Sequence, residues 1–478
     1  LPTGQDWVDV TLPHVWNGDD PKQEGPRLYH CTLTLADAAR PAFVDFGAVA
    51  GICHAWLNGC YLGCHKGGYA RFRFALTGAR AGSNELLVLA DNTHRDYIPL
   101  GGDFNNYGGI YRPVHLIQTG ATHFDLLYYG TSGLTVEPSP DGKVQVSARI
   151  AGPTEGVQIQ YEVLDQGEAC ACVTCPASAP QACLQVSRPH SWDGRKDPYL
   201  YACRARLLRD GVCLDEASLP FGFRSIQLSP EQGFFLNGQH LKLRGAAKHQ
   251  DWEGCRCAVS EAQQRQDIQL FCGMGANAVR LSHYQHPDLT YDLCDQAGLV
   301  VWAEIPLLAL PDGNEAVFEN AKQQLTELIL QLKHHPSICF WGVENEISMA
   351  GESLEMYRKI GQLHQLAKEL DPTRFTTLAN INAVKLNSQL NHLTDAVGYN
   401  IYFGWYYGEA TDYGPFFDRF HKKNPDVPLC LSEYGADSLI TLHRDDPKPG
   451  DCSEEFQCRW HETAYPQIEA RDFVWGSF

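Results

Sequence analysis

From about residue 227 to the end of the chain, short apolar runs alternate with amphipathic stretches of helical period. Eight such runs are present: Leu241–Arg244, Asn277–Leu281, Leu299–Ala303, Ile338–Gly342, Phe375–Leu378, Ala396–Asn400, Pro428–Leu431 and Phe473–Phe478. Eight strands alternating with helices over roughly 250 residues predict a (β/α)₈ barrel, also called a TIM barrel. The alternative is an open doubly wound sheet, which would carry a glycine-rich phosphate loop after its first strand. Residues 244–249, RGAAKH, do not form such a loop.

The first half of the chain has a different pattern, in which short runs of alternating apolar and polar residues are separated by Gly, Pro, Asn and Asp turns. Residues 1–119 predict a β-sandwich, and residues 120–226 repeat the pattern as an immunoglobulin-like sandwich. Residues 227–478 are then the barrel. Three domains suit a chain of 478 residues at roughly 150 residues per domain.

The chain is acidic, with 38 Lys and Arg against 57 Asp and Glu and a net charge of −19. This balance argues against a nucleic-acid partner, and no apolar run approaches the roughly 18 residues of a membrane helix. We expect a cytoplasmic protein with reduced thiols, although the chain begins with Leu1 and a trimmed N-terminus would hide a signal peptide. Cys172 and Cys175 are the one Cys-x-x-Cys motif, and we interpret them as free thiols of a loop because no matching second pair follows.

Ionisable and polar residues follow most of the predicted barrel strands. These strand ends are Arg244 to His249, Arg280 to Tyr284, Trp302 to Glu304, Trp341 to Glu346, Asn400 to Tyr402 and Ser432 to Gly435. Catalytic groups of TIM barrels lie at the carboxyl ends of the strands, and a packed core does not require charged residues there. The sequence therefore places a candidate active site at this end of the barrel.

Glu346 and Glu433 follow the fourth and seventh strands, which face each other across the barrel mouth. Two carboxyl groups that flank one bond are typical of retaining glycosidases, in which one is the nucleophile and the other the acid/base. The alternative is that each glutamate caps a loop or pairs with an arginine such as Arg244 or Arg280. The two motifs together, Asn-Glu and Ser-Glu-Tyr-Gly, favour the catalytic interpretation.

Six motifs spread along the chain resemble glycoside hydrolase family 2, which contains β-galactosidases, β-glucuronidases and β-mannosidases. The motifs are LPHVWN at 12–17, GGIYRP at 108–113, VRLSHY at 279–284, HPSI at 335–338, NE at 345–346 and SEYG at 432–435. The resemblance implies an N-terminal jelly-roll domain, an immunoglobulin-like domain and a catalytic barrel. It also implies a small or oligomeric β-glycoside as the substrate and a homo-oligomer as the assembly.

Residue by residue, the resemblance implies that Glu346 is the acid/base and Glu433 the nucleophile, with Asn345 binding the sugar 2-hydroxyl. The other implied substrate-binding residues are Asp103, His249, Arg280, His283 and Tyr402. Each has a structural alternative: a histidine satisfied within its loop, an arginine in an ion pair, a tyrosine packed at the rim or an aspartate holding a turn.

Two departures from the family pattern shape the remaining expectations. Residues 303–308, AEIPLL, lack the acidic and histidine residues that bind magnesium in one branch, so we expect no metal and no cofactor. The chain stops within its last predicted strand, so the barrel is expected to be incomplete there. The segment 442–455 resembles the β-galactosidase branch more than the β-glucuronidase branch. We therefore expect a retaining exo-β-galactosidase; the alternatives are a β-glucuronidase and a non-catalytic carbohydrate-binding scaffold.

Overall fold

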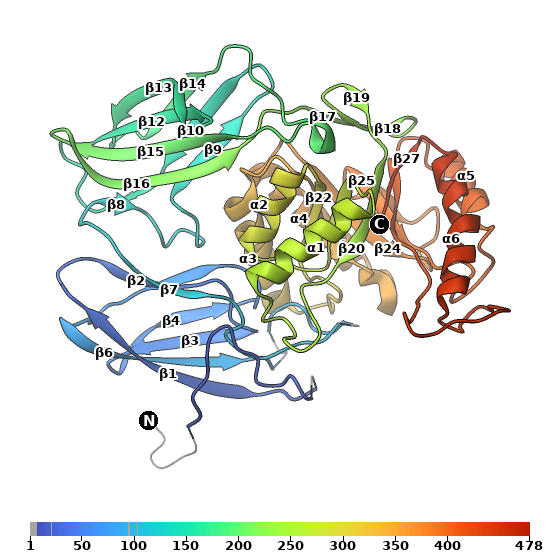
Figure 1. Ribbon diagram of the computed structural model, residues 1–478, viewed down its shortest axis with the longest axis horizontal. Coiled ribbons are helices and arrows are strands. Elements are labelled where there is room, and N and C mark those ends of the chain that lie inside the picture. Colours follow the sequence, from blue (N-terminus) through green and yellow to red (C-terminus); the bar gives the residue numbers. More distant parts are fainter. Residues whose placement is uncertain (1–6, 21, 94–95, 103) are drawn as a thin grey trace.

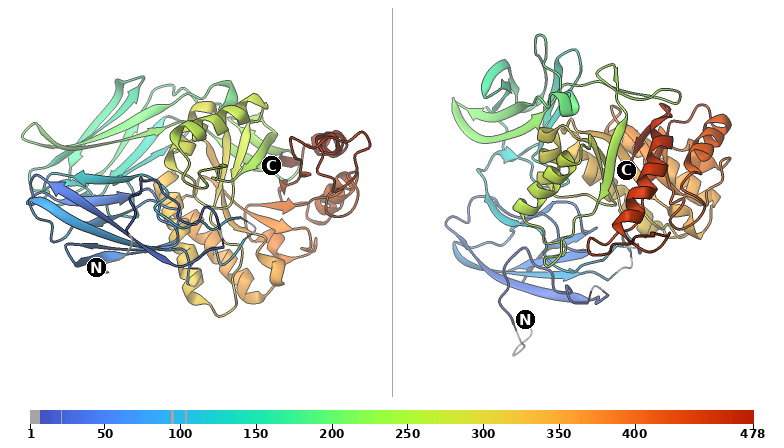
Figure 2. Two further views of the ribbon diagram at one scale, coloured as in Figure 1. Left: turned by 60° about the horizontal axis from the view of Figure 1, so that its bottom comes forward. Right: turned by 45° about the vertical axis from the view of Figure 1, so that its right-hand side comes forward.

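The computed structural model describes residues 7–20, 22–93, 96–102 and 104–478. Two β-rich domains lie against one side of a barrel, and the strands of all three parts are visible in Figure 1. Figure 2 shows from two further directions that helices α5 (Tyr413–Lys423) and α6 (Glu454–Glu469) lie on the side of the barrel away from the two β-rich domains. The multidomain architecture predicted from the sequence is therefore confirmed.

The N-terminal domain is a sandwich of two antiparallel sheets, ordered β1-β6-β3-β4 and β5-β2-β7. Its strands are β1 (Pro26–Leu35), β2 (Ala42–Phe46), β3 (Ile52–Leu57), β4 (Cys60–Lys66), β5 (Phe72–Ala75), β6 (Gly82–Asp91) and β7 (Val114–Gln118). Strand β6 alternates buried and more exposed residues, as expected for a strand with one face on a core. The buried face includes Leu86, Val88 and Ala90.

The second domain packs the sheet β13-β12-β15-β16 against the sheet β14-β10-β9 and a short pair, β8 with β11. Its strands are β8 (His123–Phe124), β9 (Leu134–Pro138), β10 (Lys143–Ala148), β11 (Ile150–Ala151), β12 (Gln158–Asp165), β13 (Glu168–Pro176), β14 (Gln181–Gln185), β15 (Tyr201–Arg209) and β16 (Val212–Phe221). Its core is a separate cluster that includes Tyr161, Val163 and Phe221.

The prediction that Cys172 and Cys175 lie in a loop is wrong, because both residues are part of strand β13. Side chains of a strand alternate between its faces, so positions three apart point to opposite sides. Cys172 is exposed and Cys175 is half-buried against the domain core. The two thiols therefore do not face a common ligand, and both are free.

A three-stranded sheet connects the second domain to the barrel; it contains β17 (Ile226–Ser229), β18 (Gly233–Leu236) and β19 (Gln239–His240). The barrel itself is closed, in the order β20 to β27. Its strands are β20 (Leu243–Lys248), β21 (Ala278–Leu281), β22 (Val300–Glu304), β23 (Ile338–Asn345), β24 (Phe375–Ile381), β25 (Ala396–Asn400), β26 (Leu429–Glu433) and β27 (Val474–Ser477). Strand β27 pairs with β26 and with β20, so the eighth strand completes the ring where the sequence suggested that it is cut.

Helices cover the outside of the barrel: α1 (Glu261–Gly273), α2 (Asp288–Ala297), α3 (Glu315–Leu332), α4 (Leu354–Leu370), α5 and α6. Ser260 and Gln263 form a capping box at the start of α1, with the Ser260 side chain accepting from the Gln263 N–H. The amphipathic pattern of α4 places Ile360, Leu363 and Ala367 in the core. Within the described part of the chain, no helix combines the length and apolar character that crossing a membrane requires.

Candidate active site

The carboxyl ends of the barrel strands surround a cleft of about 910 Å³. Because all eight strands are parallel, these ends meet at one rim, and side chains distant in sequence come together there. Four of the predicted site residues line the cleft: His283, Asn345, Glu346 and Glu433. Apolar residues of the segments 308–311 and 347–356 form much of its remaining wall.

Arg280, on β21, is the centre of the polar network beneath the cleft, and its side chain is fully buried. Its guanidinium donates to Glu433 Oε1 at 2.7 Å, to Asn345 Oδ1 at 2.8 Å and to both Glu304 oxygens at 3.0 Å. Burial opposes the charge on Arg280, but the carboxylates of Glu304 and Glu433 outweigh it and raise its pKa. The guanidinium also lies over the ring of Trp302, 4.8 Å from its centroid.

Glu433 ends strand β26, and both of its carboxyl oxygens accept hydrogen bonds. Oε1 accepts from Arg280, and Oε2 accepts from the Tyr402 hydroxyl at 2.7 Å. His283 Nε2 lies 3.7 Å from Oε1. Burial and the neighbouring Glu433 carboxylate raise the pKa of Tyr402, so its hydroxyl stays a donor. Glu433 is thus fixed by a cation on one side and a phenol on the other.

Glu346 follows strand β23 and has the left-handed backbone conformation, with φ 52° and ψ 24°. Asn400, at the end of β25, donates from Nδ2 to Glu346 Oε1 at 3.0 Å and to Asn345 Oδ1 at 3.1 Å. Ser432 Oγ donates to Asn400 Oδ1 at 2.7 Å, which fixes the orientation of that amide. Asn400 therefore gives Glu346 a neutral amide donor, whereas Glu433 has the Arg280 cation.

Both predicted histidines lie on loops that follow the first two barrel strands. His283 Nδ1 is 2.6 Å from Glu304 Oε1, and His249 Nδ1 is 3.0 Å from the Tyr284 hydroxyl. Burial opposes ionisation of Glu304, but Arg280 and His283 outweigh it and hold the pKa of Glu304 below its ordinary value. The centroids of the two histidine rings are 5.3 Å apart, so His249 packs beside His283, which lines the cleft.

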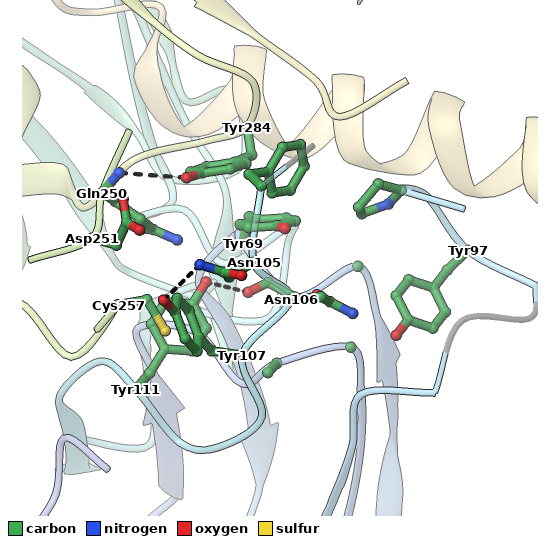
Figure 3. Close-up of a pocket in the computed structure, with 16 residues that line it drawn as sticks. Tyr69, Tyr97, Asn105, Asn106, Tyr107, Tyr111, Gln250, Asp251, Cys257 and Tyr284 are labelled. Carbon is green, nitrogen blue, oxygen red and sulfur yellow. Dashed lines mark hydrogen bonds between the residues drawn. The ribbon is translucent and has the colours of Figure 1, made fainter. Parts of the chain in front are cut away.

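Asp103 lies outside the described residues, but the jelly-roll loop around it reaches the barrel. The Phe104 ring is 5.5 Å from His249 and 5.3 Å from Tyr284. Figure 3 shows the polar pocket behind this contact, where the Tyr284 hydroxyl meets the Gln250 N–H and Asn105 meets Tyr107. The N-terminal domain therefore contributes part of the wall that holds His249.

Three residues of the network had no predicted role: Glu304, Asn400 and Phe104. Glu304 and Asn400 stand at strand ends, so the positional signal that selected the other residues was present in the sequence. Phe104 has no such signal, because its contact depends on how two domains pack. Arg244 pairs with Glu469 at 2.8 Å, so it is not a partner of the two cleft glutamates. Among the described residues, no cluster of three or more His, Cys, Asp or Glu could hold a metal ion.

Comparison with known proteins agrees with this geometry. The barrel domain of glycosyl hydrolases family 2 matches residues 227–470, and a second model of the same family matches residues 133–224. A β-glucuronidase of Bacteroides fragilis is 36% identical over 98% of this chain and 72% of the relative. The structure of an FMN-binding β-glucuronidase from Faecalibacterium prausnitzii superposes with a TM-score of 0.95 at 36% identity, covering 100% of this chain and 76% of that one. A putative β-galactosidase structure from Bacteroides fragilis gives 0.93 at 32% identity, covering 99% and 74%. The chain belongs to glycosyl hydrolases family 2.

Proposed function

We propose that the protein is a retaining exo-β-glycosidase that removes terminal β-glucuronosyl groups, with Glu433 as nucleophile and Glu346 as general acid/base. The observation that carries the proposal is the unlike setting of two glutamates in one cleft. Glu433 is held by Arg280 and Tyr402, whereas Glu346 accepts from the neutral amide of Asn400. A carboxyl group held by a cation and a phenol suits the nucleophile, whereas one with a neutral amide donor suits the acid/base, which must carry a proton in the first step.

In the first step, the Glu433 carboxylate attacks the anomeric carbon while the Glu346 carboxyl gives its proton to the glycosidic oxygen. The carbon–oxygen bond breaks, the aglycone leaves as an alcohol, and an ester joins the sugar to Glu433. In the second step, the Glu346 carboxylate takes a proton from water as the water oxygen attacks the same carbon. The ester breaks, and the sugar leaves with its original anomeric configuration.

The surrounding residues supply orientation. Arg280 and Tyr402 aim the Glu433 oxygens, and the carbonyl end of Asn345 is occupied by Arg280 and Asn400. The Asn345 NH₂ group is then the end that we assign to the sugar 2-hydroxyl. A hydrogen bond to that hydroxyl that strengthens in the transition state contributes directly to the rate. His249 and His283 are assigned to the sugar subsite because His283 lines the cleft and the His249 ring packs beside it.

The preference for a glucuronide replaces the galactoside expected from the sequence. Its support is that the two relatives at 36% identity are both β-glucuronidases. The second candidate is a β-galactoside, which is supported by the 32% identical structure and by the cleft chemistry. None of the described cleft-lining residues is Lys or Arg, the side chains that would pair with a uronate carboxylate.

Two measurements test the proposal. Comparing kcat/KM for 4-nitrophenyl β-D-glucuronide and the matching β-D-galactoside should favour the glucuronide by more than about tenfold, a difference of roughly 1.4 kcal/mol in transition-state binding. The reverse ratio would assign the galactoside instead. Glu433→Gln should abolish turnover of both substrates, and a variant that keeps normal activity would overturn the mechanism. Absence of turnover by the wild-type protein would favour a carbohydrate-binding scaffold.

A further inference from the structure

Glu344 is a buried carboxyl group two residues before Glu346, and the mechanism above does not use it. It is 1% exposed and lies in strand β23, next to Asn345 and close to Glu346, which line the cleft. Oε2 accepts the N–H of Ile347 at 2.9 Å, and Oε1 accepts the N–H of Ala379 at 3.1 Å. A buried carboxyl group is costly, so its position at the turn that carries Glu346 requires an explanation.

The bond to Ala379 lies at a break in the sheet. Strand β23 pairs Gly342 with Thr377 and Asn345 with Ala379, so three steps on β23 oppose two on β24. This is a β-bulge, which disrupts the local ladder and re-aims the side chains beside it. The Glu344 carboxyl group accepts a backbone N–H at this irregular point and thereby joins β23 to β24.

The bond to Ile347 lies on the other side of Glu346. Ile347 begins a short 3-10 helix, Ile347–Ala350, and the first N–H groups of a helix need outside acceptors. Glu346 itself donates its N–H to the Ala379 carbonyl at 2.8 Å. A left-handed conformation is unfavourable for a non-glycine residue, so the turn requires restraint from its surroundings. The two Glu344 bonds supply that restraint on both sides.

We propose that Glu344 is a positioning residue that fixes the backbone turn of Glu346 and so aims its carboxyl group at the glycosidic oxygen. The inference rests on the proposed function, because it takes Glu346 as the general acid/base. Glu344 acts through the backbone of residues 346–347 and 379 and does not touch the substrate. No other described side chain accepts from both Ile347 and Ala379.

The groups around Glu344 shift its pKa in both directions. Burial raises the pKa of Glu344 to about 8, and the nearby Glu304 acts in the same direction. The N–H groups of Ile347 and Ala379 oppose that rise, as does Arg280. Because both backbone partners are donors, Glu344 must present two acceptor oxygens, which a carboxyl group does with or without its proton, whereas a glutamine amide would satisfy one partner and turn its own NH₂ group toward the other.

The test compares leaving groups. Misplacing a general acid slows the release of poor leaving groups, which need a proton, but hardly affects 2,4-dinitrophenolate, which does not. We expect Glu344→Gln and Glu344→Ala to lower kcat/KM for phenyl glycosides by about 10- to 100-fold, and to change it less than about threefold for the dinitrophenyl glycoside. Glu346→Ala is the reference and should show the same dependence more strongly.

Glu327→Gln is the matched control. Glu327 is another buried glutamate, in α3, and its side chain is 2.8 Å from His65 Nε2. This variant should lose stability without gaining a dependence on the leaving group. If the Glu344 variants slow both substrates equally, or neither, while Glu346→Ala discriminates, the positioning role is wrong and the proposed function stands. If Glu346→Ala does not discriminate, the acid/base assignment itself fails.

Discussion

At the scale of single residues, the two cleft glutamates differ in their hydrogen-bond partners. Glu433 lines the cleft and shares Arg280 with Glu304, and these two partners are buried beneath it and shielded from water. Electrostatic contacts are strongest in such surroundings. Glu346 is instead reached by the amide of Asn400, which does not stabilise a negative charge as a cation does. The same residue type can therefore serve as nucleophile at one position and as acid at the other.

Tyr402→Phe should lower kcat by about 10- to 100-fold, because it removes the hydroxyl that donates to Glu433 Oε2. Steady-state kinetics with an aryl glycoside checks this value, and the melting temperature should change little. Tyr406→Phe is the control, since Tyr406 is 66% exposed and its ring lies beside that of Tyr402, with the centroids 5.1 Å apart. Equal kcat values for the two variants would contradict a catalytic contribution from the Tyr402 hydroxyl.

Glu344 also predicts a pH dependence of stability. Burial raises its pKa in the folded protein from 4.5 to about 8, so between these values the folded state holds a proton that the unfolded chain has released. The free energy of unfolding contributed by this group therefore falls as pH rises through that window. Chemical denaturation across the window should show Glu344→Gln gaining stability relative to the wild type as pH increases. A stability difference between Glu344→Gln and the wild type that stays constant with pH would contradict the raised pKa of Glu344.

At the scale of elements, the positions of strand ends could be predicted from the sequence, but the local irregularities could not. Glu346 and Glu433 follow apolar runs that any strand search finds, and parallel pairing then brings them together. The bulge after Gly342 leaves no mark in the hydrophobic pattern, because it depends on register with β24. Cys172 and Cys175 were misplaced because Ala, Thr and Cys alternate too weakly in β13 to indicate a strand.

Gly342→Ala tests how tightly the strand-end layer is packed. A β-carbon at this position would lie 2.4 Å from Trp302 Nε1 and 2.5 Å from Glu304 Cβ, so the layer that supports Arg280 must shift. We expect a loss of about 1–3 kcal/mol in stability together with reduced activity. Gly361→Ala is the control: it lies within α4 with no atom within 4 Å of the added carbon, and should stabilise by roughly 0.5–1 kcal/mol. Thermal unfolding and kcat are measured for both variants, and a Gly342→Ala protein with unchanged stability and kcat would contradict tight packing of this layer.

At the scale of the whole molecule, the N-terminal sandwich contacts the barrel loops that contain site residues. Arg112, which is buried, donates to Gln250 Oε1 at 2.7 Å and to the Gln285 carbonyl at 2.8 Å. The rings of Tyr69 and Tyr284 stack with centroids 4.4 Å apart. The three-domain order was accessible from turn spacing and periodicity, whereas these contacts were not, because they join segments more than 100 residues apart. The sandwich thereby holds the segments next to His249 and His283.

Arg112→Ala should therefore affect both stability and substrate binding. Removing the guanidinium leaves buried acceptors without donors, which costs about 2–4 kcal/mol, and frees the loops after β20 and β21. We expect a lower unfolding midpoint and a higher KM. Arg265→Ala is the control, because this side chain forms an exposed pair with Glu261 on α1 worth about 0.5 kcal/mol or less. An unchanged KM in Arg112→Ala would show that this contact between the domains does not affect substrate binding.

The most direct test of the account traps the ester on Glu433. A 2-deoxy-2-fluoro-β-glucuronosyl fluoride forms the glycosyl-enzyme quickly, because fluoride leaves readily, and the ring fluorine slows its hydrolysis by destabilising the transition state. Mass spectrometry of the intact protein and of its peptides then locates the label. The account predicts one fluoroglycosyl unit per chain, attached to the peptide that contains Glu433 and absent from Glu433→Gln. A label on Glu346, or hydrolysis of glycosides with inversion and without any label, would contradict it.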